Sequence, residues 1–297
     1  SEYMAFNLAY GMATGAFMSL AGVAGNFASI KPHLDMAAPI MKSVPESAGG
    51  KQVLEHCSGR IEMDNVTFRY AEGAPAVLDD LSLKIRPGQS VGVVGKTGCG
   101  KSTLMRLLLG FEKPQKGAVL YDGRDIETLD VASLRRNIGT VLQDGKLFTG
   151  DIFSNIVVAA PWLTMEDAWE AAELAGIADD IRAMPMGMNT MVSEGAGGIS
   201  GGQRQRILIA RAVAPKPKVL FFDEATSALD NVTQRQVSEA LDRMKCTRII
   251  VAHRLSTIRA CDRIIVLDGG RVVEDGTYEE LCALGGVFAE LVERQTM

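Results

Sequence analysis

The stretch that decides the fold runs from residue 90 to residue 109 and reads SVGVVGKTGCGKSTLMRLLL. Ser90–Val94 is a short apolar run typical of a buried strand, and Lys101–Leu109 has the apolar spacing of a helix. Between them, residues 95–102 match the pattern G-x-x-x-x-G-K-[ST]. A strand, a glycine-rich loop and a helix in that order predict a phosphate-binding loop in an α/β protein.

The residue types of this loop each have a physical reason. Its glycines let the backbone fold into a concave nest whose N–H groups point at phosphate oxygens, and the positive end of the following helix faces the same anion. We expect Lys101 to reach the β- and γ-phosphates and the Ser102 hydroxyl to bind Mg²⁺. The residues expected to contact the nucleotide are Gly95, Lys96, Thr97, Gly98, Cys99, Gly100, Lys101, Ser102 and Thr103.

A second apolar run supplies an acidic partner for the loop. Residues 219–222 lead directly into Asp223 and Glu224, at the end of a strand where open α/β sheets bind ligands. Because side chains alternate along a strand, the two carboxylates diverge and can do different work. We expect Asp223 to hold the Mg²⁺ shell and Glu224 to act as general base on the attacking water. An Asp-Glu pair after a strand most often marks only the solvent-exposed start of a loop. Together with the phosphate loop, it indicates nucleotide hydrolysis.

Strand-like and helix-like runs alternate through most of the chain. Their alternation predicts a parallel-sheet α/β core. Hairpin-like runs at the start predict an added antiparallel sheet. We expect residues about 151–200 to form a helical insertion. The expected strands are 60–70, 77–85, 90–94, 117–121, 138–142, 219–222, 247–252 and 263–267, and the expected helices are 101–109, 132–136, 165–184, 203–213, 231–244 and 278–294.

The first thirty residues differ from the rest. No charged residue occurs between Tyr3 and Ile30, a run longer than the roughly 20 apolar residues that cross a bilayer. We interpret this run as the cytosolic end of a transmembrane helix, with a buried helix of a soluble domain as the alternative. A signal peptide is disfavoured because a basic n-region is missing. A helix would place a packing seam along Tyr3, Phe6, Tyr10, Ala13, Phe17, Leu20, Ala24 and Phe27.

The predicted domain boundary follows a proline- and glycine-containing stretch. Residues 31–59 mix these residues with charges and predict a short helix followed by a linker. We therefore expect residues 1–59 to form a helical and linker segment, the remnant of a transmembrane helix, and residues 60–297 to form a nucleotide-binding domain.

Composition narrows the classes of function. The 297 residues are 47% hydrophobic and 23% charged, which suffices for a packed core and excludes a mainly disordered chain. The net charge is −5, with no basic block, and this argues against a nucleic-acid partner. Five scattered cysteines without a CxxC pair or zinc spacing indicate free thiols in a reducing compartment.

From about Arg60 to the C-terminus, the sequence resembles the ATP-binding cassette (ABC) family. The discriminating motif is Ile199-Ser200-Gly201-Gly202-Gln203, which is similar to the family's signature motif with Ile where Leu is usual. Its residue types describe a second nest followed by a helix, in which Ser200 and the glycine amides can bind a γ-phosphate. The resemblance implies that this nest serves the nucleotide held by the opposite subunit of a head-to-tail homodimer with ATP.

The resemblance also implies roles for residues whose type and position would not by themselves indicate a function. Tyr70 matches the aromatic residue that stacks on adenine, and Gln143 the glutamine that touches Mg²⁺ and the attacking water. His253 matches the histidine that contacts the γ-phosphate and orients that water. Residues 227–230 match a loop that crosses the dimer interface, and residues 192–195 match more loosely a segment that senses the membrane domain. With every catalytic position in place, we expect two competent sites that use ATP and Mg²⁺.

The same resemblance predicts the cassette of an exporter half-transporter. Its partners would be the transmembrane domains of the same transporter, at the cytoplasmic face of the cell membrane, and bacterial peptide or bacteriocin exporters are the most similar group. The alternatives are the stand-alone ATPase subunit of an ABC importer and a soluble ABC ATPase acting as a mechanical switch. A non-hydrolysing structural cassette is disfavoured by Glu224 and His253.

Overall fold

The computed structural model describes residues 2–43, 46, 50–142, 145–192, 198–223, 231–251 and 255–296. The chain divides into two compact units, Ser1–Gly49 and Gly50–Met297. The sequence instead predicts a boundary after residue 59. The ten intervening residues pack with the second unit, because Leu54 and Cys57 are buried in its core and Gln52 bridges to Leu129.

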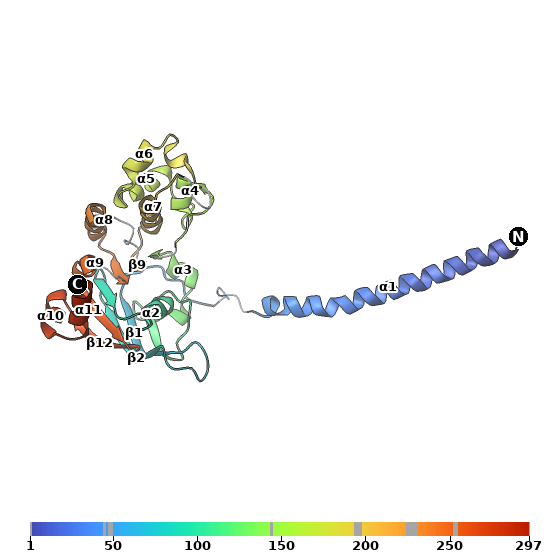
Figure 1. Ribbon diagram of the computed structural model, residues 1–297, viewed down its shortest axis with the longest axis horizontal. Helices are drawn as coiled ribbons and strands as arrows, with labels where there is room; N and C mark the ends of the chain where they lie inside the picture. The colour runs from blue at the N-terminus through green and yellow to red at the C-terminus, as the bar shows by residue number, and fades with distance from the viewer. Residues whose placement is uncertain are drawn as a thin grey trace. The chain divides into compact units, whose positions relative to one another are not determined.

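The first unit is built on helix α1 (Glu2–Lys42), drawn in blue in Figure 1. It continues through Pro32 and Pro39, where the sequence predicts a separate short helix. Proline removes one main-chain hydrogen bond and bends a helix, but it does not always end one. Within the described part of the chain, α1 is the one helix that could cross a membrane by length and composition. That it derives from a transmembrane helix stays a prediction.

The main sheet of the second unit has six strands in the order β12-β11-β3-β10-β9-β6. Neighbouring strands are parallel, except that β12 runs antiparallel to β11. The strands are β3 (Ser90–Val94), β6 (Ile138–Val141), β9 (Val219–Asp223), β10 (Thr247–Val251), β11 (Arg263–Asp268) and β12 (Arg271–Gly276). The parallel core is confirmed, but β12 is not among the predicted strands.

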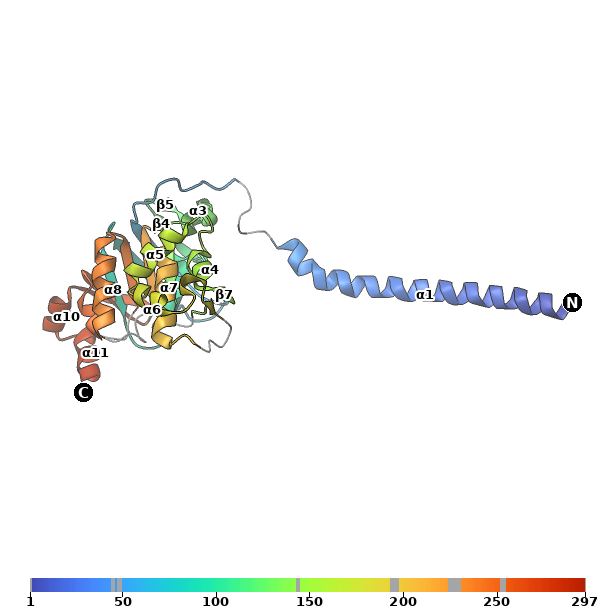
Figure 2. The same cartoon turned by 90° about the horizontal axis from the view of Figure 1, so that it is seen from above.

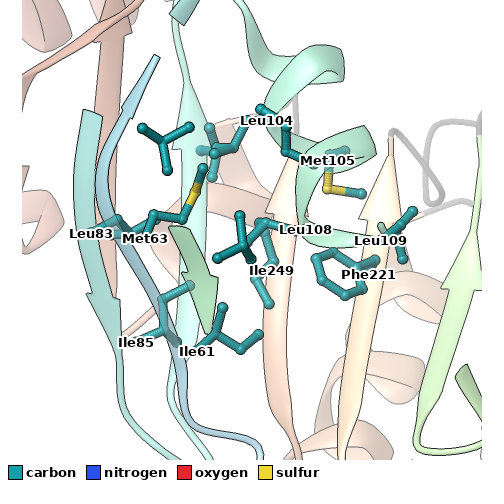
Figure 3. Close-up of a cluster of buried hydrophobic side chains, with 14 of the residues drawn as sticks. Ile61, Met63, Leu83, Ile85, Leu104, Met105, Leu108, Leu109, Phe221 and Ile249 are labelled. Carbon is teal, nitrogen blue, oxygen red and sulfur yellow. The ribbon is translucent and has the colours of Figure 1, made fainter. Parts of the chain in front are cut away.

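An antiparallel sheet of order β2-β1-β4-β5 completes the predicted arrangement. Its strands are β1 (Ile61–Phe68), β2 (Leu78–Ile85), β4 (Lys116–Tyr121) and β5 (Arg124–Asp125). Helix α2 (Lys101–Leu108) contributes Leu104, Met105 and Leu108 to one buried cluster with residues of both sheets, as Figure 3 shows. Each fully buried side chain of this kind contributes about 1.5–3 kcal/mol. The start of α2, and with it the preceding loop, is thereby fixed on the core.

A group of helices lies at the top of the second unit in Figure 1. It consists of α4 (Ile152–Val157), α5 (Met165–Leu174), α6 (Ala178–Ala183) and α7 (Gly201–Val213), with the 3₁₀ helix η2 (Gly187–Asn189) and the strand pair β7 (Gly150–Asp151) and β8 (Met191–Val192). The single helix predicted over 165–184 is wrong. The chain breaks it at Gly176, whose φ of +65° favours glycine.

Short helices fill the remaining connections. They are η1 (Ile126–Thr128), α3 (Val131–Arg135), α8 (Asn231–Arg243), α9 (Leu255–Arg259), α10 (Tyr278–Leu284) and α11 (Val287–Thr296). The helix predicted over 278–294 is also two helices, because Gly285 adopts a φ of +69° between them. Figure 2 shows α10 and α11 beside each other, at the end of the unit where the chain finishes.

Candidate nucleotide-binding site

Four of the five parallel strands in the main sheet lead, at one edge, into the predicted site residues. They are β3, β6, β9 and β10, and their last residues are Val94, Val141, Asp223 and Val251. Val251 pairs with Val93 on one side and with Asp223 on the other, so these two flanking residues lie two strand spacings, about 10 Å, apart. Ligands of open α/β sheets bind at the carboxyl ends of such strands. This edge is where the phosphate loop begins.

The predicted Gln143, Glu224 and His253 come within two residues of the ends of β6, β9 and β10 along the sequence. They lie outside the described residues, as do residues 227–230 and 193–195, so their roles stay predictions. The described strand ends nevertheless bring three separate segments of sequence to the edge where the phosphate loop starts. Strand topology therefore supports one common site for all of them.

The phosphate loop, residues 95–103, forms a nest that we call the loop nest. Gly95, Gly98 and Gly100 have φ values of +152°, +83° and +108°. A Cβ atom at Gly95 would lie 2.2 Å from the backbone oxygen of Leu267, and one at Gly100 would lie 2.7 Å from Leu78 Cδ2. Conformation and space therefore both require glycine at these two positions.

The end of α2 that faces this loop has no side-chain cap. Its N-cap residue is Gly100, which has no side chain, and among the residues that the structure describes no side-chain cap bond is made to the start of the helix. Most helices satisfy at least one of these amides with a Ser, Thr, Asp or Asn side chain. An uncapped N-terminus within a glycine-rich nest fits a phosphate group, because the amides and the helix dipole both favour an anion.

Lys101 is folded back into the loop nest. Its Nζ atom donates hydrogen bonds to the backbone oxygens of Gly95 at 2.8 Å and Lys96 at 3.1 Å, and lies 3.8 Å from Cys99 Sγ. The residue is 8% exposed, which is rare for a lysine. The nest therefore carries a positive charge held by its own backbone.

Tyr70 is held close to the loop nest. Its hydroxyl is 3.1 Å from the Oγ1 atom of Thr103, and its ring lies edge-on to Phe68 with centroids 4.9 Å apart. The residue is still 56% exposed. The structure thus brings together Tyr70 and the phosphate loop, leaving much of the aromatic ring open to a planar group.

The signature residues Ser200–Gln203 form the start of α7, which we call the signature nest. Ser200 is the N-cap of α7, and its Oγ accepts a hydrogen bond from Gln203 N at 3.2 Å. The Gln203 Oε1 atom in turn accepts one from Ser200 N at 3.0 Å. This reciprocal pair is a capping box. Ser200 and Gly201 are exposed, so the helix end faces solvent.

Asn155 and Arg211 form a side-chain network between α4 and α7 that was not predicted from the sequence. Arg211 on α7 donates to the backbone oxygen of Asn155 at 2.8 Å and to its Oδ1 at 2.7 Å. Asn155 also accepts from Phe148 N at 2.8 Å and donates to Phe148 O at 2.9 Å. Burial lowers the pKa of Arg211. This network ties α7 to the segment that follows Gln143, and no local pattern indicates contacts between residues so far apart.

The family profile of ABC transporters matches residues 78–227, which include both nests and Asp223. The chain belongs to the ABC transporter family. Its fold class is thereby confirmed, and as an ABC-type ATP-binding domain the chain is an ATPase.

Similar curated proteins are parts of bacterial secretion systems. The cyclolysin secretion/processing ATP-binding protein CyaB of Bordetella pertussis is 44% identical over 294 residues, 98% of this chain and 41% of that protein. The alpha-hemolysin translocation ATP-binding protein HlyB of Escherichia coli O157:H7 is 42% identical over 282 residues, 94% of this chain and 40% of that protein. The chain therefore spans about two fifths of the length of these relatives.

A solved structure gives the same result for the fold. A bacterial Atm1-family ABC exporter with ATP bound matches with a TM-score of 0.85 and 37% identity, over 90% of this chain and 47% of that one. The resemblance to exporter-type ABC ATPases predicted from the sequence is confirmed by these comparisons.

Proposed function

We propose that this ABC domain binds ATP with Mg²⁺, hydrolyses it in a head-to-tail homodimer, and thereby drives export through the transmembrane domains of the same transporter. The observation that carries the proposal is the pair of nests. One has an uncapped helix start with a buried lysine beside it, and the other is an exposed helix start on a separate group of helices.

The loop nest holds the triphosphate in this proposal. The amides of the first turn of α2 bind phosphate oxygens, and Lys101 places its ammonium against them. Ser102 and Asp223 offer the hard oxygen ligands that Mg²⁺ prefers, and Gln143 is the third expected ligand. Mg²⁺, when bound, neutralises charge on the phosphate oxygens. Tyr70 stacks on the base; such stacking contributes about 1–3 kcal/mol and tolerates any base, so we expect little nucleotide selectivity.

The signature nest completes the site from the other subunit. Its exposed amides and the Ser200 hydroxyl meet the γ-phosphate of the partner's nucleotide, and two-fold symmetry yields two such sites. Closure excludes bulk water, so that Glu224 acts on one remaining water as general base and His253 orients it. Loss of the γ-phosphate removes the contact between subunits and reopens the dimer.

Export is favoured over the other roles by α1 and by the relatives. An importer's stand-alone ATPase subunit and a soluble mechanical switch have no need for a helix long and apolar enough to cross a membrane. The relatives are named for moving cyclolysin and alpha-hemolysin, so we propose a secreted peptide or protein as cargo. We place the ATPase at the cytoplasmic face of the cell membrane, without a nucleic-acid partner.

Phosphate release by the full chain in detergent micelles tests this proposal. We expect turnover that depends on both ATP and Mg²⁺ and rises more steeply than linearly with protein concentration, because two chains make each site. Turnover strictly proportional to protein concentration, with no ATP-dependent association in analytical ultracentrifugation, would contradict the composite site.

A further inference from the structure

We propose that Asp180 on α6 is a positioning residue that sets the orientation of the signature nest. The inference rests on the proposed function, because it concerns the nest that acts on the partner's nucleotide. Asp180 does not belong to the signature motif and lies 23 residues before Gln203 along the chain.

The side chain of Asp180 uses its two oxygens on two different residues of α7. Its Oδ1 accepts a hydrogen bond from Gln203 Nε2 at 2.8 Å, and its Oδ2 accepts one from Arg206 Nη1 at 2.7 Å. The Arg206 Nη1 atom also donates to the backbone oxygen of Gly176 at 2.6 Å. The Asp180 carboxylate and the Gly176 carbonyl thus fix the first two turns of α7 against α6 and the segment before it.

The bond to Gln203 determines which way its amide points. A carboxylate accepts hydrogen bonds but cannot donate them, so Asp180 requires the Nε2 end of the amide. The Oε1 end is then left for Ser200 N, where it forms half of the capping box. The order Asp180, Gln203, Ser200 is therefore a continuous chain of hydrogen bonds from α6 to the first residue of the signature nest.

Arg206 strengthens this link through charge. Its side chain is 15% exposed and that of Asp180 is 31% exposed, so the pair is partly removed from water. Burial alone raises the pKa of Asp180, but the hydrogen bonds from Gln203 and Arg206 outweigh it and leave the pKa below its ordinary value. The carboxylate is therefore charged at neutral pH, as the geometry requires.

The neighbouring Asp179 provides a matched control. It occupies the same helix and carries the same charge, but its side chain is 97% exposed and pairs with Arg182 on α6 itself, at 2.9 Å. An asparagine at position 179 removes a charge from α6 without touching α7. Asp180→Asn replaces one carboxylate oxygen by an NH₂ group, which then faces a donor of Gln203 or Arg206. The Gln203 amide can relieve this conflict by rotating through 180°, and it then loses its hydrogen bond with Ser200 N.

The test compares the full chain with Asp180→Asn, Asp180→Glu and Asp179→Asn, all in detergent micelles. Three quantities are measured: the melting temperature, the affinity of the dilute protein for MgATP, and ATP turnover as a function of protein concentration. We expect Asp180→Asn to bind MgATP within about twofold of the wild type but to need a roughly tenfold higher protein concentration for half-maximal turnover. We expect Asp180→Glu to recover part of this loss and Asp179→Asn to behave as the wild type.

Two outcomes would overturn the inference. If Asp180→Asn and Asp179→Asn give the same turnover curve, Asp180 does not position the nest. If Asp180→Asn and Asp180→Glu both lower melting temperature, MgATP affinity and turnover together, the role of Asp180 is only to hold the helices in place. Failure of the proposed function looks different, because the wild type itself would then show no ATP-dependent association.

Discussion

The two nests of this chain differ in how much of their chemistry each one carries. In the loop nest, the helix start has no side-chain cap, Gly95 and Gly100 are required by their φ values and by close contacts, and two carbonyl oxygens of the same loop hold Lys101. In the signature nest, the helix start already has a capping box, and its outer residues are exposed. The loop nest has an uncapped helix start and its own cation, so it can bind an anion by itself. The signature nest is capped and exposed, which suits contact with an anion already bound to another subunit.

This difference predicts which property each substitution changes. Substitutions in the loop nest should weaken nucleotide binding by the single chain. Substitutions in the signature nest should leave that affinity unchanged and slow turnover, which requires two chains. Variants from each region therefore test whether the two nests have these separate roles.

The largest effect on turnover is expected for Glu224, which is predicted to act once both nests have closed on one nucleotide. Glu224→Gln removes the predicted general base, and we expect turnover to fall by about 10²–10⁴-fold while MgATP binding persists. The closed dimer should accumulate, because the γ-phosphate that joins the subunits is no longer removed; sedimentation with ATP measures this. Glu279→Gln, at an exposed position in α10, is the control. Normal turnover in Glu224→Gln would require a different base.

Lys101→Ala tests how much the Lys101 ammonium contributes to nucleotide binding by the loop nest. The substitution removes the buried ammonium, and we expect the affinity for MgATP to fall by about 10- to 100-fold in titration calorimetry, the usual range for charge-assisted hydrogen bonds. Lys113→Ala, which changes an exposed lysine paired with Glu127, controls for net charge. An unchanged titration for Lys101→Ala would remove the basis of the loop-nest assignment.

Tyr70→Ala separates recognition of the base from recognition of the phosphates. Loss of stacking should weaken ATP binding by about 5- to 150-fold, corresponding to roughly 1–3 kcal/mol, and leave the affinity for tripolyphosphate unchanged. Phe111→Ala is a suitable control, because Phe111 has the same exposed fraction, 56%, and lies outside the predicted site. If tripolyphosphate affinity falls equally, Tyr70 supports the loop through Thr103 rather than contacting the base.

The smallest effect is expected for Ser200→Ala. The substitution removes half of the α7 capping box, worth about 1 kcal/mol, and one predicted γ-phosphate ligand. We expect turnover to fall about fivefold or more with MgATP affinity of the dilute chain unchanged. Thr164→Ala removes the same kind of cap from α5, where no ligand is predicted. Equal losses in the two variants would show that helix stability alone accounts for the effect.

The sequence predicts those features that depend on neighbouring residues. The loop nest and β9 are recognisable because a buried strand, its turn and its carboxylate are contiguous. The breaks at Gly176 and Gly285 were missed, since helix formers continue on both sides of each glycine. Strand β12 was missed because none of its residues is buried and its sequence RVVEDG does not alternate apolar and polar residues, although Gly269 and Gly270 mark the turn before it.

The parts of the site that depend on the tertiary fold could not be predicted from local patterns. Arg211 contacts Asn155, and Asp180 contacts Gln203 and Arg206, only because α4 and α6 pack beside α7. Each of these residues looks like an ordinary surface polar group in the sequence. Their hydrogen-bond partners lie 23–56 residues away along the chain.

The bare start of α2 makes nucleotide a structural component of this fold as well as its substrate. A helix end that lacks a cap of its own is stabilised when phosphate oxygens accept its amide protons, so folding and binding are thermodynamically linked. At a nucleotide concentration a hundredfold above Kd, the folded state gains about 2.7 kcal/mol. Protection of the amides at residues 100–103 from hydrogen exchange should rise in parallel. In a cell rich in ATP, the stability of this domain is therefore set partly by the energy supply that it consumes.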